Sequence, residues 1–288
     1  MNLLPFIASG IGLGAVYGMS AVGIVVLYRA SGTLNFAFGA LGAAAAHCTW
    51  TLIEYEILPV WLAWIVGILV ATLISFLYGW FVSSKLIDRS RAIRAIATLG
   101  LALFLLGIIT TIWGPGLPRR LSLPTDFMNV VIFGIKLSYT RLAGFVFAVL
   151  AVIGVAILLN RTRVGLAMRS LASNRPVSSL IGINVAAVDS VAWLISGAFA
   201  GIAGLLLADL VVMSPIPLTF LVIPAIAAAV LGRLTSMTGA FIGGLIGGFA
   251  EALLTGVPQV AVVRSAAPYL IALLFIGLVT RANVGARD

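Results

Sequence analysis

The 288 residues are 62% hydrophobic and 9% charged, and their mean hydropathy is +1.22. A soluble domain carries about 25% charged residues, so this composition excludes a water-soluble globular protein. The chain has 17 Lys and Arg residues against 8 Asp and Glu residues. Because the basic residues fall between apolar runs, they indicate orientation in a membrane, and no binding to nucleic acid is predicted.

Nine apolar runs follow one another, and a membrane-spanning helix needs about 20 such residues. They cover residues 6–27, 34–53, 58–82, 93–113, 142–159, 188–212, 218–231, 238–254 and 267–280. The seventh run is short and contains Pro224, so a broken or re-entrant element there would change the count. The sequence thus predicts an all-α polytopic integral membrane protein with eight to ten transmembrane helices, some of them broken. No basic residue precedes the first run, so no cleavable signal peptide is expected.

The basic residues divide unequally between the two sides that nine spans define. Twelve of the 17 fall on one side: Arg29, Lys85, Arg89, Arg91, Arg94, Arg161, Arg163, Arg169, Arg175, Arg233, Arg281 and Arg287. The others are Arg119, Arg120, Lys136, Arg141 and Arg264. Since cytoplasmic loops are the richer in Lys and Arg, we expect the N-terminus outside and the C-terminus in the cytoplasm.

The segment GTLNFAFGALGA, residues 32–43, places an amide in an apolar run and surrounds it with glycines such as Gly39. An amide in hydrocarbon is costly unless it is hydrogen-bonded. One interpretation is a broken helix in which Asn35 lines or closes a translocation path, with Phe36 and Phe38 as an apolar constriction. The alternative is that Asn35 caps the N-terminus of the second helix.

Two loops have structure of their own. An alternating stretch at 130–139 predicts a short extracellular hairpin. On the other side, residues 160–185 read NRTRVGLAMRSLASNRPVSSLIGINV. This loop is either a solvated basic connector or a short amphipathic helix that docks a partner protein.

Five segments together resemble the permease subunits of branched-chain amino-acid ABC importers. They are LYRASGTLNFAFGALGAAAA, ATLGLALFLLGIITTIWG, NRTRVGLAMRSLASNRPVSSLIGINVAAV, SGAFAGIAGLLLA and AAAVLGRLTSMTGAFIGGLIGG, and they cover nearly the whole chain. Three positions depart from the family pattern. Phe38 stands where relatives often have histidine, Arg233 replaces the second glycine of a Gly-Gly pair, and Ala282 follows Arg281 where many relatives have proline.

The resemblance implies a single permease domain, 1–288, in the bacterial inner membrane. Its partners would be a second, homologous permease subunit, two cytoplasmic ATPases and a periplasmic solute-binding protein. The substrate would be a branched-chain amino acid or a related small solute. The loop at 160–185 would then be the ATPase-coupling element. A helix over 167–174, ending at Asn174, would place Leu171 and Ala172 in a cleft of an ATPase, with Arg169 and Arg175 at its acidic rim. Gly182 would let the chain return to the bilayer.

No enzyme chemistry is predicted. The chain has no GxxxxGK[ST] phosphate loop, and His47 beside Cys48 has no partner at ligand spacing, so neither cofactor nor metal is expected.

The glycine-rich GLGAVYG and GGLIGG indicate close helix packing, or alternatively pore lining. Glu251 and Asp209 lie in or near apolar runs and suggest proton relay or gating, or else carboxylates satisfied near the interface. A proton-coupled carrier or a channel without ATPases is therefore the alternative function, and a purely structural membrane subunit is disfavoured by the same polar residues.

Overall fold

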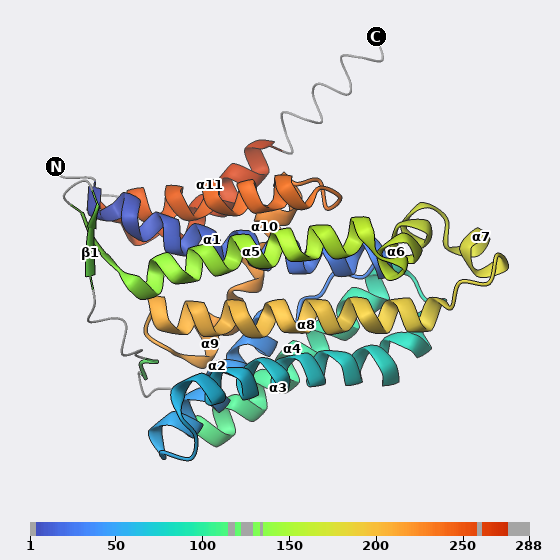
Figure 1. Ribbon diagram of the computed structural model, residues 1–288, viewed down its shortest axis with the longest axis horizontal. Coiled ribbons are helices and arrows are strands. Elements are labelled where there is room, and N and C mark those ends of the chain that lie inside the picture. The colour runs from blue at the N-terminus through green and yellow to red at the C-terminus, as the bar shows by residue number, and fades with distance from the viewer. Residues whose placement is uncertain (1–3, 115–118, 122–128, 133–134, 258–260, 276–288) are drawn as a thin grey trace, which may run out of the picture.

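The computed structural model describes residues 4–114, 119–121, 129–132, 135–257 and 261–275, which form a bundle of helices (Figure 1). In chain order the elements are α1 (Leu4–Ser31), α2 (Phe38–Glu54), α3 (Val60–Phe81), η1 (Ser83–Leu86), α4 (Arg91–Trp113), β1 (Asn129–Ile132), β2 (Ile135–Ser138), α5 (Tyr139–Arg161), α6 (Arg163–Ser173), α7 (Arg175–Leu180), α8 (Val185–Leu210), α9 (Pro215–Phe220), α10 (Val222–Leu231), α11 (Met237–Thr255) and η3 (Ala261–Ala266).

Within the described residues, six helices are long and apolar enough to cross a membrane, namely α1, α3, α4, α5, α8 and α11. Pro215–Leu231 and Arg264–Phe275 are shorter apolar helical stretches, and α2 has 17 residues. Each of the nine predicted runs therefore contains helix, and the polytopic all-α prediction is confirmed. The end of the ninth run, beyond residue 275, lies outside the described residues.

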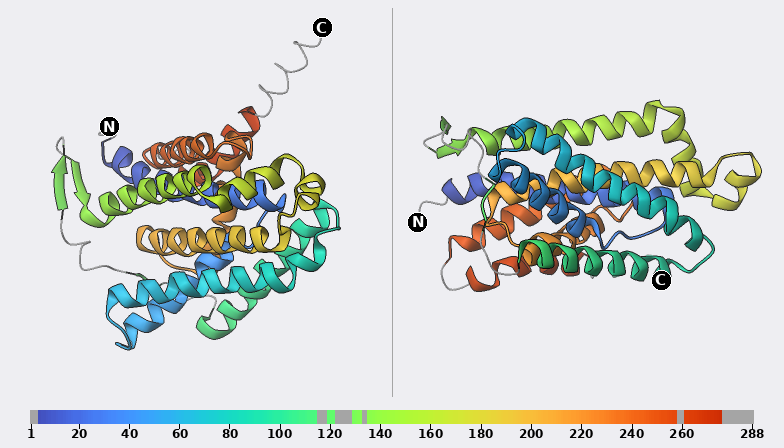
Figure 2. Two further views of the ribbon diagram at one scale, coloured as in Figure 1. Left: turned by 45° about the vertical axis from the view of Figure 1, so that its right-hand side comes forward. Right: turned by 90° about the horizontal axis from the view of Figure 1, so that it is seen from below.

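The long helices run side by side, and α1 and α8 form the centre of the bundle (Figure 2). The apolar window of α1 is 89% buried and that of α8 is 72% buried, whereas those of α3, α4 and α5 are each 22% buried. The exposed sides of these outer helices are themselves apolar. They carry Leu69, Leu103, Phe104 and Leu150. Such an apolar exterior is what a surface in contact with lipid requires.

Glycines bring α1 and α11 into direct backbone contact. A Cβ atom added to Gly244 would lie 2.1 Å from the backbone nitrogen of Gly18, and one added to Gly248 would lie 2.2 Å from that of Gly14. No side chain fits at such distances, so close packing of small residues holds the two helices together. The packing interpretation of GLGAVYG and GGLIGG is confirmed.

The predicted hairpin is present as strands β1 and β2. They pair antiparallel, with Asn129 opposite Ser138 and Ile132 opposite Ile135. The prediction extended one residue too far, because Tyr139 already begins α5. Near the same end of the bundle, Arg119 and Met213 form an isolated antiparallel bridge between two connecting segments.

The seventh predicted run is broken, but the break lies at Leu221, between α9 and α10, and not at Pro224. Pro224 falls in the first turn of α10. The amide hydrogens of a first turn have no partner within the helix, so a proline there removes no helical hydrogen bond.

Candidate functional site

Most of the basic segments meet at one end of the bundle, which we call the basic end. It comprises the end of α1 with Arg29, the start of α4 with Arg91, the α6–α7 region with Arg175, and the turn at Leu234 and Thr235. A cavity of about 610 Å³ lies between these four segments. None of the described residues that line it is acidic. Segments predicted from charge to share one side thus share one end of the structure.

A stretch without helix separates α1 from α2, and we call residues Gly32–Ala37 the unwound segment. Gly32 has a φ of +69°, a left-handed conformation that ends a helix without strain at glycine. The segment bonds to Thr98, the eighth residue of α4, and to Ser196, the twelfth residue of α8. At 1.5 Å per residue it therefore lies roughly 10 to 17 Å inside the ends of those helices. The predicted unwinding at the start of the second apolar run is present, because α2 begins only at Phe38.

The amide of Asn35 is completely buried and hydrogen-bonded. Its Oδ1 accepts from the N–H of Ala37 at 3.0 Å, and its Nδ2 donates to Oγ of Ser196 at 3.5 Å. The N-cap residue of α2 is Ala37, which makes no side-chain cap bond. Asn35 is thus not the helix cap of the alternative interpretation, and it closes a turn two residues earlier.

Thr98 satisfies the backbone on both sides of Asn35. Its hydroxyl accepts from the N–H of Phe36 at 3.0 Å and can donate to the carbonyl of Leu34 at 3.0 Å or of Ala95 at 2.7 Å. Without these bonds, each unpaired backbone group at this depth would cost roughly several kcal/mol of folding free energy. Sequence reasoning missed Thr98, because a single hydroxyl in an apolar helix has no pattern that distinguishes it.

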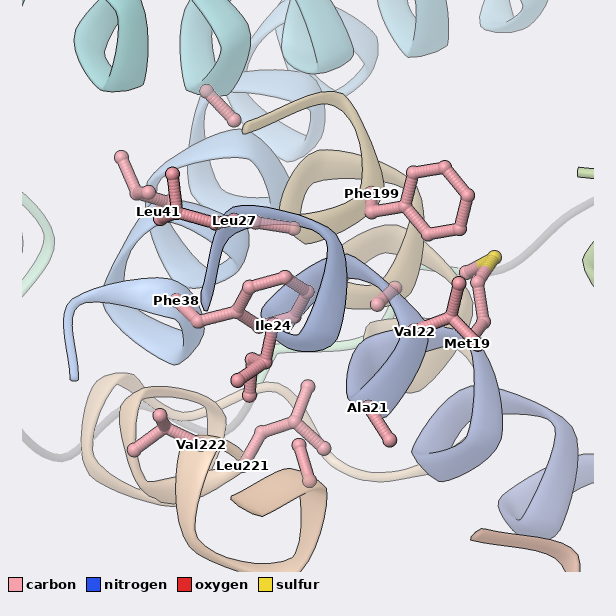
Figure 3. Packing of buried hydrophobic residues seen from close by; sticks show 14 of the residues in the cluster. Met19, Ala21, Val22, Ile24, Leu27, Phe38, Leu41, Phe199, Leu221 and Val222 are labelled. Carbon is pink, nitrogen blue, oxygen red and sulfur yellow. The ribbon is translucent and has the colours of Figure 1, made fainter. Parts of the chain in front are cut away.

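The break between α9 and α10 faces the start of α2. A Cβ atom added to Gly39 would lie 2.0 Å from the carbonyl oxygen of Thr219, so the two backbones are in contact. The ring of Phe38 is fully buried beside Ile24, with Leu221 and Val222 close by (Figure 3). Two interruptions of regular helix therefore meet in the interior. Phe36 is partly exposed, and a constriction formed by Phe36 and Phe38 stays a prediction.

Glu251 belongs to a separate polar cluster. Its Oε2 accepts a hydrogen bond of 2.8 Å from the hydroxyl of Tyr17 on α1. Arg264 and Ser265 also interact with this carboxylate. The side chain of Asn35 bonds to Ala37 and to Ser196 on α8, so it shares no hydrogen-bond partner with Glu251 among the described residues.

The geometry expected of the 160–185 loop is largely confirmed. Thr162 Oγ1 accepts from the N–H of Gly165 at 3.1 Å and starts α6 at Arg163, four residues before the predicted start. Asn174 Oδ1 accepts from the N–H of Val177 at 3.2 Å and starts α7, whose first turn contains Pro176. Gly182 has a φ of +89° and turns the chain into α8.

The side chain predicted to enter a partner is on the wrong face. Leu171 is only 2% exposed, because α6 turns this face toward α1 and α5. A buried leucine cannot fill a cleft on another protein. Ala172 beside it is exposed. The large exposed apolar side chains of this region are Val164, Leu166, Val177, Leu180 and Ile181, and Leu180 is 86% exposed.

Arg175 is also engaged within the chain. Its Nη2 lies 2.5 Å from Oδ2 of Asp189 on α8, and its Nη1 donates to the carbonyl of Ala30 at 3.1 Å. The expectation that Arg175 reaches an acidic rim on a partner is therefore wrong for this arrangement. Arg169 is exposed. The sequence pattern does not indicate Asp189, since 14 residues and one turn separate it from Arg175.

His47 is a packed core residue. It is fully buried, its Nδ1 lies 2.8 Å from the carbonyl oxygen of Ala43, and its ring contacts that of Trp113 with centroids 5.5 Å apart. Among the residues that the structure describes, no group of three or more His, Cys, Asp or Glu side chains could hold a metal ion.

Residues 6–280 match the model of the family described as "Branched-chain amino acid transport system / permease component". The chain is 30% identical over 260 residues to the high-affinity branched-chain amino acid transport system permease protein LivH of Escherichia coli strain K12, covering 85% of this chain and 83% of the relative. It is 32% identical over 250 residues to a probable branched-chain amino acid transport permease protein LivH of Methanocaldococcus jannaschii, with coverages of 82% and 76%. It is 28% identical over 267 residues to BraD of Pseudomonas aeruginosa, with coverages of 87% and 86%.

Proposed function

Because this chain belongs to the family of permease components of branched-chain amino acid transport systems, we propose that it forms half of the pathway of an ATP-driven importer. The match over residues 6–280 carries this proposal, and it favours an importer over a proton-coupled carrier or a channel. The substrate is a branched-chain amino acid or a related small solute, as the names of the relatives suggest. The whole chain acts as one transmembrane domain beside a second, homologous permease subunit.

The unwound segment is the proposed gate of this pathway. Irregular backbone at membrane depth is tolerated where it lines a cavity or is buried in protein, and transport proteins place binding sites at such breaks. Two breaks lie close together here, because Gly39, just after the unwound segment, contacts Thr219, two residues before the break at Leu221. The buried ring of Phe38 supports a closed state. Glu251 is a second polar group of the proposed pathway. It lies near the C-terminal end of α11, whereas the N-terminal end of α11 follows the turn at the basic end.

Two cytoplasmic ATPase subunits dock at the basic end, and a solute-binding protein delivers the substrate to the opposite end. The docking surface consists of exposed apolar side chains on α6, on α7 and just after α7, together with the basic cavity beside them. These side chains are Leu166, Ala172, Val177, Leu180 and Ile181. Exposed leucines at the aqueous end of a membrane protein are unfavourable unless a partner covers them.

Replacing Leu180 with aspartate should separate the ATPases from the permease. Burying one leucine is worth about 1.5 to 3 kcal/mol, and the substitution also places an unpaired charge in the contact, so recovery of the complex should fall about tenfold or more. The measurement is copurification of coexpressed ATPase subunits with the tagged permease. Ile57→Asp is the matched control, because Ile57 is an exposed aliphatic residue in the α2–α3 connection. If Leu180→Asp retains its ATPases as the control does, this surface is not the docking site.

We propose that the basic end lies in the cytoplasm of a bacterial cell and the N-terminus outside the inner membrane, and the excess of basic residues at that end supports this orientation. In a Cys48→Ala background, Tyr55→Cys should react with an impermeant thiol reagent in intact cells, and Ser173→Cys should react only after permeabilisation. Both positions are exposed, so the difference reports sidedness and not burial. The reverse pattern would invert the proposed orientation.

A further inference from the structure

We infer that Asp189 is a positioning residue, which holds α7 to the unwound segment through Arg175 and so couples the docking surface to the gate. The inference rests on the proposed function, since both the docking surface and the gate are parts of it. It adds a residue that the sequence pattern does not indicate.

The guanidinium of Arg175 joins three elements. One nitrogen pairs with Asp189 on α8 at 2.5 Å, and another donates to the carbonyl of Ala30 at the end of α1 at 3.1 Å. The side chains of Arg175 and Asp189 are 26% and 8% exposed. A charge-assisted bond so little exposed to water is stronger and better defined in geometry than a surface ion pair. The start of α7 is thus tied to the last turn of α1.

A second arginine fixes the next residue of α1. Arg94 on α4 donates to the carbonyl of Ser31 at 2.6 Å, and Asp189 interacts with this arginine too. The hydroxyl of Ser31 in turn accepts from the N–H of Thr33 at 3.1 Å. Two cations therefore hold the carbonyls just before Gly32, and one carboxylate balances both cations.

One face of α8 holds the end of α1 and also the unwound segment that follows it. Asp189 acts through Arg175 on the end of α1, and Ser196 receives the hydrogen bond of Asn35. These two α8 residues are seven positions apart, which is two helical turns, so they lie on the same side of the helix. A displacement of α7 relative to α8 must break the Arg175 contacts, or else carry the end of α1 and the unwound segment with it. Loss of the carboxylate removes that constraint.

The test combines a local accessibility measurement with transport. Ser178 on α7 is buried, so in a Cys48→Ala background Ser178→Cys reports the release of α7 from the bundle. Adding Asp189→Asn should raise the labelling rate of this cysteine about tenfold, because breaking a buried pair by removing one partner leaves a charge uncompensated. In reconstituted vesicles the same variant should keep its ATPases and their basal hydrolysis. Its solute uptake and solute-stimulated hydrolysis should fall about tenfold.

Asp88→Asn is the matched control, because it removes an exposed carboxylate in the connection before α4 and should change neither readout. If Asp189→Asn is not recovered folded, Arg175→Lys replaces it. This variant keeps the charge but loses the planar guanidinium that reaches both Asp189 and Ala30, and it should raise the labelling rate.

Unchanged labelling in the recovered variant would show that the Arg175–Asp189 pair does not hold α7 to the bundle. Increased labelling with normal stimulated hydrolysis would overturn the coupling role. If the unmodified permease copurifies no ATPase, the proposed function fails, while the labelling result still decides whether the tie exists.

Discussion

Gly244→Val should abolish recovery of correctly folded permease. A side chain at this position would begin 2.1 Å from the backbone nitrogen of Gly18, and no rotamer change moves a backbone atom. Overpacking a core typically costs about 1 to 3 kcal/mol where side chains can adjust, and a contact with backbone exceeds that range. Since α1 is the most buried of the long helices, separating it from α11 opens the centre of the bundle. The measurement is the monodisperse fraction in size-exclusion chromatography in detergent, with the melting temperature of what remains.

Gly107→Val provides the control for this substitution. Gly107 lies within α4, and apart from its chain neighbours and the nearby backbone of α4 itself, no described atom lies within 4 Å of a Cβ atom built there. Both changes add the same side chain and the same helix-propensity cost to an apolar helix. The control should therefore keep a normal elution profile. Equal behaviour of the two variants would mean that contact between α1 and α11 does not limit stability.

Asn35→Leu should leave membrane insertion intact and lower solute uptake about tenfold or more, because it removes two hydrogen bonds that define the unwound segment. The N–H of Ala37 and the hydroxyl of Ser196 would both lose their bond to Asn35. An apolar side chain also favours continuation of helix through residues 32–37, which would move the proposed gate. Uptake of labelled solute into vesicles, together with ATP hydrolysis, measures the effect and separates a blocked pathway from a leaking one.

Thr33→Val is the matched control in the same segment. The side-chain hydroxyl of Thr33 is buried and has no hydrogen-bond partner among the described residues, and valine has nearly the same shape. It should transport as the unmodified protein does. Normal, fully coupled transport by Asn35→Leu would show that the gate lies elsewhere.

The sequence predicted the elements well, because their signals are local. Apolar runs, the turn residues near Pro176 and Gly182, and the alternation before Tyr139 each act within a few residues, and all appear in the structure. The glycine motifs were also interpreted correctly, since small residues within apolar helices have few other uses.

The sequence did not predict which face of an element meets which neighbour. α6 has apolar residues on both sides, with Leu166 exposed and Leu171 buried, and its own pattern does not say which side faces the bundle. Asp189 and Thr98 act on segments distant in sequence, through contacts that exist only after the helices assemble. The roles of Arg175 and Leu171 were wrong for the same reason: an arginine or a leucine in a loop fits a partner protein and its own chain equally well.

The deep burial of α1 has a consequence for how the protein is made. Among the six long helices of the described residues, α1 is synthesised before the other five, yet its closest backbone contacts are with α11, the last of them. While the intervening helices are synthesised, the glycine-lined side of α1 has no permanent neighbour and meets lipid or the insertion machinery. Enclosure of α1 is therefore a late event that joins the two distant parts of the chain. In a chain that stops before α11, the glycine-lined side of α1 would lack its partner helix, so we expect such a chain to be less resistant to proteolysis than one that contains α11.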